Sequence, residues 1–136
     1  MNTRDQRGSA SIWAIIVIAG AFTVLLGLVV DGGRVVDARV AASRAAAQAA
    51  RVGADALSSS SVRNGHDAID VEVAKVQAQN YLHDAGMTGT VNTAGQTVTV
   101  TVSGKSSTQI LGVIGIASFP IEETASAQAV TEAGRP

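Results

Sequence analysis

The sequence contains no cysteine, which excludes disulfide bonds, cysteine-ligated zinc and thiol catalysis. Aromatic residues make up only 3% of the 136 residues, so a folded core has to be built from Val, Ile, Leu and Ala. The net charge is −1, and neither a basic field nor an RNA-binding aromatic motif occurs. Nucleic acid is therefore not an expected partner.

Enzyme motifs are also scarce. The sequence shows no glycine-rich phosphate loop, no nucleophile elbow and no paired-carboxylate spacing. His66, Asp67 and Asp70 form an H-D-x-x-D pattern, but a helix start explains it: Asp67 is a good N-cap and Asp70 suits the positive helix end. We expect no enzyme, no cofactor, no metal and no small-molecule substrate.

What the sequence does have is a long apolar run, residues 11–30, without a single charge. As a helix it measures about 30 Å, the thickness of a bilayer's hydrocarbon core. It is apolar on every side, and the remaining chain has too few large apolar residues to wrap it. The run predicts one transmembrane helix. Gly20 and Gly27 share a face of that helix, which predicts close packing against another helix in lipid.

The flanks of this run favour a retained signal anchor. Residues 1–10 form a short polar tail, and no small-x-small cleavage site directly follows Val30. Charge alone gives little indication of topology. We place the N-terminus in the cytoplasm because long C-terminal domains are translocated largely regardless of charge. The prediction is a single-pass protein of the bacterial cytoplasmic membrane with an extracytoplasmic C-terminal domain.

Asp31, Gly32, Gly33 and Arg34 mark the exit from the membrane, and an alanine-rich, proline-free stretch follows. We predict that the helix continues as a stalk over residues 31–57. Its polar positions recur at helical period as one stripe: Arg34, Asp37, Arg44, Gln48, Arg51 and Asp55. The predicted apolar face is made by Val36, Val40, Ala47, Ala50, Ala54 and Leu57.

Residues 58–136 are predicted to form a small extracytoplasmic head. It begins with a loop at 58–67, followed by a helix at 68–85 with Gly86 as its stop. Strands are predicted at 90–93 and 97–102, where Val and Thr alternate, and at 119–131, an edge strand because of Pro120. Residues 106–116 are either a helical turn under the sheet or a membrane-surface loop. The expected class is α+β: a three-stranded, mainly antiparallel sheet with one or two helices on a single face.

The order of these features resembles the TadE/TadG-like proteins of Flp (Tad, type IVc) pilus assembly, in the short form seen in actinobacteria. The residues that carry the resemblance are the tail end Arg7-Gly8-Ser9-Ala10, the exit motif at 30–34, the helix end at 51–57, VQAQNYL at 76–82, ILGVIGI at 110–116 and ASAQA at 125–129. The similarity covers nearly the whole chain. It implies a pilin-like or pseudopilin-like membrane protein that works with pilin subunits, a secretion ATPase and a platform protein.

The resemblance also implies a candidate prepilin peptidase junction between Gly8 and Ser9. In pilins of this type a Glu five residues beyond the cut neutralises a neighbour's new N-terminus, whereas here that position is Trp13. No acidic residue occurs between Gly8 and Asp31, and an unpaired amine in lipid is costly. This departure favours a minor component over the polymerising subunit. The alternative is a signal-anchored binding or adaptor protein unrelated to a filament.

Overall fold

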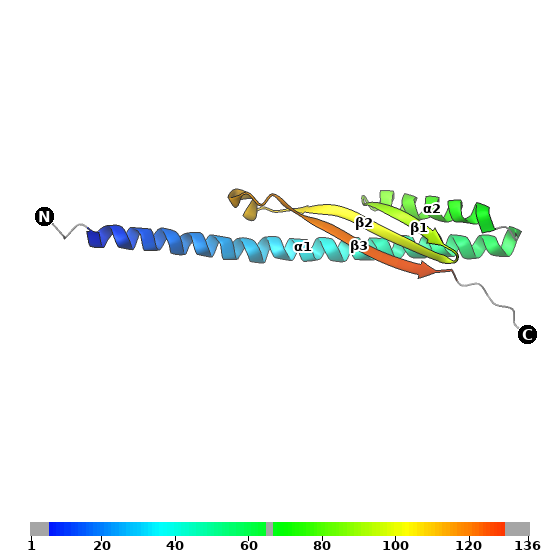
Figure 1. Cartoon of the computed structure of the whole chain (residues 1–136), viewed down its shortest axis with the longest axis horizontal. Coiled ribbons are helices and arrows are strands. Elements are labelled where there is room, and N and C mark those ends of the chain that lie inside the picture. The colour runs from blue at the N-terminus through cyan, green and yellow to red at the C-terminus, as the bar shows by residue number, and fades with distance from the viewer. Residues whose placement is uncertain (1–5, 65–66, 130–136) are drawn as a thin grey trace, which may run out of the picture.

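The computed structural model describes residues 6–64 and 67–129, with side chains described at 9–58 and 71–129. Its elements in order are α1 (Gln6–Asn64), α2 (Asp67–Asp84), β1 (Thr88–Ala94), β2 (Thr97–Ser107), the 3-10 helix η1 (Leu111–Ile114) and β3 (Ser118–Gln128). α1 is a single rod of 59 residues, and the rest of the chain packs along its C-terminal part (Figure 1). At 1.5 Å per residue the rod is about 88 Å long. The predicted α+β class is confirmed.

The rod continues through Gly32 and Gly33 without a break, as the alanine-rich sequence beyond them predicts. The predicted loop that begins at residue 58 is wrong as far as Asn64, because α1 is helical to that residue. At the start of this stretch Ser58 Oγ donates to the carbonyl oxygen of Ala54 at 3.1 Å, so its polar side chain is satisfied within the helix. Composition alone therefore placed the end of the helix too early.

The face of α1 that meets the head consists of small residues. Ala46, Ala49 and Ala50 are completely buried, and the predicted polar stripe from Arg34 to Asp55 is exposed at every position. The predicted apolar face is wrong close to the predicted membrane exit, where Val36 and Val40 are exposed and Ala38 and Ala42 pack toward the head. Alanine allows the sheet to approach the helix backbone more closely than a branched valine does.

The sheet has the strand order β1-β2-β3, and both pairs are antiparallel. The predicted alternation is confirmed, with valine on the buried face and threonine on the other. The buried face is lined by Val91, Val98, Val100, Val102 and Ile121. On the opposite face the hydroxyl of Thr99 bonds that of Ser126 at 3.0 Å, and Thr101 bonds Thr124 at 2.9 Å. The third strand is an edge strand, as Pro120 predicts, although Val130 and Thr131 lie outside the described residues.

Both helices lie on one face of this sheet, as predicted. They meet it at Gly53 of α1, where an added Cβ would lie 2.9 Å from a Val98 methyl on β2 and 3.3 Å from the Ala74 carbonyl oxygen on α2. α2 ends as predicted at Gly86, whose φ is 67°. The Gly86 N–H donates to the His83 carbonyl and the Met87 N–H to the Leu82 carbonyl, which is a Schellman motif.

The β2–β3 loop (residues 108–117) extends past the head toward the N-terminal part of α1 and lies beside that helix (Figure 1). It contacts α1 at Gly27 through Ile110 and Leu111. A turn under the sheet, one of the two placements that the sequence leaves open, is therefore wrong. The reason is that α1 and α2 already cover the buried face of the sheet.

Candidate functional site

The N-terminal part of α1 projects beyond the head (Figure 1). Its apolar side chains are exposed. Within the described parts of the chain, α1 is the one helix long and apolar enough to cross a membrane, and only 6% of its most apolar stretch is buried. A core helix of a soluble protein would be covered. A cleaved signal would be separate from the domain, whereas α1 continues into the core of the head. The helix therefore fits a single-pass membrane anchor.

The two glycines of the predicted packing face have different surroundings. A Cβ on Gly27 would lie 2.9 Å from Ile110 Cγ2 and 3.0 Å from Leu111 Cδ2, so this glycine is covered by the chain's own loop. Around Gly20 no described atom comes within 4 Å of an added Cβ. Gly20 thus remains a candidate for contact with another molecule, whereas Gly27 packs on its own chain.

One turn beyond Gly27, Asp31 holds the β2–β3 loop against α1. Its Oδ1 accepts the backbone N–H of Gln109 at 2.8 Å. Its Oδ2 accepts the N–H groups of Ile110 at 3.0 Å and Leu111 at 2.8 Å. We call these three hydrogen bonds the Asp31 clasp. They occupy the donors at the start of η1, which no intrahelical carbonyl satisfies.

The environment of Asp31 favours its charged form. Asp31 is 1% exposed, and among the described residues it is the one charged residue that is buried. The N–H groups of Leu111 and Gln109 lower the pKa of its carboxyl most strongly, burial opposes them, and the Ile110 N–H and the positive charge of Arg34 lower it further. Arg34 and Gly33 are themselves exposed, and Gly32 is half-buried. Within the exit motif, Asp31 is thus the residue that makes a specific tertiary contact.

The sign of this pKa change predicts how the clasp responds to acid. A carboxyl with a lowered pKa in the folded state stabilises that state above its unfolded pKa, and the stabilisation is lost as the pH falls through the folded value. We expect amide exchange of residues 109–111, corrected for intrinsic rates, to be constant from about pH 5 to 8 and to accelerate only in strong acid, below the ordinary Asp value of 3.8. A loss of protection near pH 6 would contradict the assignment.

The contact at Gly27 predicts an asymmetric result for two matched substitutions. Gly27→Leu should push Ile110 and Leu111 away from α1 and speed amide exchange across residues 108–117, because the added side chain needs the space that they fill. Gly20→Leu should leave exchange in this loop unchanged, because its surroundings within the described chain are open. Hydrogen exchange read by mass spectrometry in detergent micelles measures both. Equal loop exchange in the two variants would contradict the packing.

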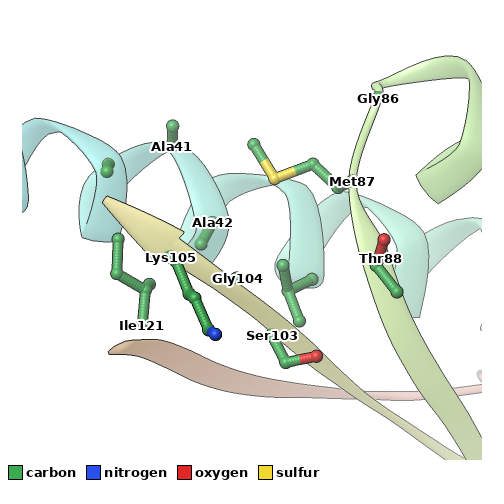
Figure 2. A pocket seen from close by; sticks show the side chains of 11 residues that line it. Ala41, Ala42, Gly86, Met87, Thr88, Ser103, Gly104, Lys105 and Ile121 are labelled. Atoms are coloured by element: carbon green, nitrogen blue, oxygen red, sulfur yellow. The ribbon is translucent and has the colours of Figure 1, made fainter. Parts of the chain in front are cut away.

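A separate cavity of about 390 Å³ lies where α1 meets the sheet (Figure 2). Ala41 and Ala42 of α1, Met87, Lys105 of β2 and Ile121 of β3 are among the residues around it. Its lining is mostly small and apolar, and Lys105 is its one ionisable group. Besides Lys105, its polar side chains are the hydroxyls of Thr88 and Ser103.

The other residues singled out in the sequence do not gather into a site. Among the described residues no three of His, Cys, Asp or Glu lie close enough to hold a metal ion. His66 and the side chains of Asp67 and Asp70 lie outside the described part. The backbone of Gly8 and Ser9 belongs to the first turns of α1, which leaves the candidate cleavage junction as a prediction.

Sequence reasoning missed the three amide donors of the clasp at residues 109–111. Their signal is weak, because a backbone N–H can come from any residue except proline. A faint signal did exist at the acceptor. Asp31 is the single acidic residue beside the apolar run and directly follows it, and such a carboxylate needs partners.

Comparison with known protein families matches residues 8–56 to the family described as Flp pilus-assembly TadE/G-like. The resemblance predicted from the sequence is therefore confirmed for this segment. The segment contains the apolar part of α1 that is predicted to span the membrane, Asp31 and most of the alanine face, and it ends before the sheet. Neither the curated proteins nor the solved structures searched contain a match to this chain.

Proposed function

We propose that this chain, with its TadE/G-like segment, is a minor pilin-like or pseudopilin-like membrane component of Flp/Tad pilus assembly or of a related secretion system. The observation that carries the proposal is the family match along α1. That match supports a role related to pilus assembly and suggests a structural rather than a catalytic component. The finer assignment, a minor component acting by helix packing and protein contacts, is the proposal.

The geometry supports contact through the membrane helix. Lipid tails are as apolar as the side chains of a membrane helix, so there is no hydrophobic drive for two such helices to associate. They associate instead where small residues allow their backbones to approach. Gly20 is such a position, and no part of the described chain covers it. We propose that a helix of a pilin subunit or of the platform protein packs at Gly20, while the secretion ATPase acts from the cytoplasmic side.

The proposed orientation has residues 1–10 in the cytoplasm and the head outside the cytoplasmic membrane. Cleavage by a prepilin peptidase between Gly8 and Ser9 is part of the proposal. The absence of a Glu at position 13, where Trp13 stands, supports a subunit that accompanies or primes a fibre over one that forms its bulk.

The test is crosslinking in membranes of cells that hold the pilus machinery. Gly20→Leu should leave the protein inserted, because leucine favours the bilayer, and should reduce crosslinks to pilin subunits or assembly proteins severalfold. Ala21→Leu is the matched control, because it adds the same side chain about 100° around the helix. If both variants crosslink as the parent does while changes in the head abolish crosslinking, the adaptor alternative is favoured instead.

A further inference from the structure

We propose that the β2–β3 loop is a second membrane-inserted element, which enters the head-side leaflet of the bilayer beside the transmembrane part of α1. This inference rests on the membrane anchoring in the proposed function and adds a new lipid-binding surface to it. The chain would then be held in the membrane at two points, and the head would have a fixed tilt and height above the bilayer.

The loop exposes apolar side chains. Val113 is 87% exposed, Ile114 55% and Ile116 42%. No charged residue occurs between Lys105 and Glu122. Large apolar side chains that gather on one exposed loop, with no charge among them, are typical of a surface that meets a membrane or a partner.

The position of the loop along α1 selects the membrane. Ile110 and Leu111 touch α1 at Gly27, and a cavity of about 70 Å³ separates Thr23 and Val24 from the loop residues Val113 and Ile114. Measured along the helix from Asp31, Gly27 is about 6 Å and Thr23 about 12 Å inward. A bilayer whose hydrocarbon begins near Val30 must therefore also surround the loop, within the depth of one leaflet.

The loop also pairs most of its backbone N–H groups, which matters in lipid because each unpaired N–H is costly there. Three of its N–H groups donate to Asp31 in the clasp. Four more, from Thr108, Val113, Gly115 and Ile116, donate to backbone carbonyls of the same loop. The Thr108 hydroxyl donates to the Ile116 carbonyl oxygen. Seven backbone N–H groups of the loop are therefore paired within the chain, while Val113, Ile114 and Ile116 expose apolar side chains.

Lipid is a better occupant than a protein partner because the surface is continuous with the membrane segment. Val24, Leu28 and Phe119 extend the loop's apolar surface on both sides, and the Thr23 hydroxyl is turned inward to the Ala19 carbonyl at 2.9 Å. A protein-binding surface normally adds polar groups around its apolar centre. This loop has no charged side chain, and its two polar ones are Gln109 and Thr108, whose hydroxyl is already bonded to the Ile116 carbonyl oxygen.

The absence of cysteine allows a direct test with the full chain in phosphatidylethanolamine–phosphatidylglycerol vesicles. A spin label is attached at one engineered cysteine. Its rate of collision with oxygen, which partitions into lipid, is compared with its rate of collision with a water-soluble nickel chelate. Val113→Cys tests the loop. Leu25→Cys serves as the hydrocarbon reference, and Val73→Cys, an exposed valine on α2 of the head, is the matched control.

We expect the ratio of oxygen to nickel accessibility at Val113 to equal that at Leu25 and to exceed that at Val73 severalfold. A label at Val113 that meets nickel as readily as the label at Val73, with Leu25 still in lipid, would overturn the inserted loop and leave the anchor intact. A label at Val113 shielded from both reagents would assign the surface to a second copy and also overturn the proposal. A water-exposed label at Leu25 would overturn the anchor itself.

Discussion

Replacing Asp31 with alanine is expected to free the β2–β3 loop from α1 while the head stays folded. The substitution removes the acceptor of three backbone N–H groups that have no other partner in η1. We expect the amides of Gln109, Ile110 and Leu111 to exchange on the order of tenfold to a hundredfold faster in detergent micelles. The buried hydrophobic cluster of the head includes no residue of this loop, so the strands of the head should keep their protection.

Two comparisons isolate the cause. Asp37→Ala removes an exposed carboxylate from the same helix and should not change the loop. Asp31→Asn keeps the shape but replaces one acceptor oxygen with an N–H₂ donor, so it should restore protection only in part. If Asp31→Ala exchanges like the parent at residues 109–111, the clasp does not hold the loop.

Gly53→Leu is expected to destabilise the head strongly, because three elements meet at this glycine. An added Cβ would already lie 2.9 Å from a Val98 methyl and 3.3 Å from the backbone oxygen of Ala74. A leucine has to separate α1 from both β2 and α2. Overpacking of this kind costs about 3 kcal/mol of unfolding free energy. For a domain of this size the loss corresponds to roughly 15 °C in Tm, followed by circular dichroism in detergent.

The control for helix propensity is Gly33→Leu, which makes the same change in the same helix. Around Gly33 no described atom lies within 4 Å of an added Cβ. Leucine is a better helix former than glycine, so this variant should melt at or above the temperature of the parent. A Gly53→Leu variant that melts with the parent would show that α1 does not touch the sheet at this point.

The sequence correctly predicted the elements that are determined by a local pattern of residues. The change of period from 3.6 to 2 identified the hairpin, Gly86 marked the end of α2, and the polar stripe identified the exposed side of the stalk. Val36 and Val40 were misplaced because hydrophobicity favours burial of valine over alanine. The contact with the sheet instead selects the smaller residue, and no local pattern contains that preference.

The site was harder to predict because its parts are distant in sequence. Asp31 and Leu111 are 80 positions apart and meet through main-chain donors that carry no residue signature. Gly27 shows the same difficulty: the spacing of Gly20 and Gly27 predicted one packing face, but only the folded chain shows that a loop covers one of the two. The sequence placed Asp31 and both glycines on one long helix, which the structure confirms, and left their partners open.

Because α1 is one unbroken helix, the number of its residues determines how the head is rotated about the helix axis relative to Gly27 and Asp31. Each residue turns the helix by about 100° and advances it by about 1.5 Å. One residue inserted between Arg34 and Ala38 would therefore rotate the alanine face by that angle relative to Asp31 and Gly27. An insertion of seven residues would nearly restore the angle but would add about 10 Å of height, which the strands β2 and β3 would have to bridge to keep the loop at Asp31. The angle between the side of α1 that carries Gly27 and Asp31 and the alanine face that carries the head is thus set by the number of residues between them.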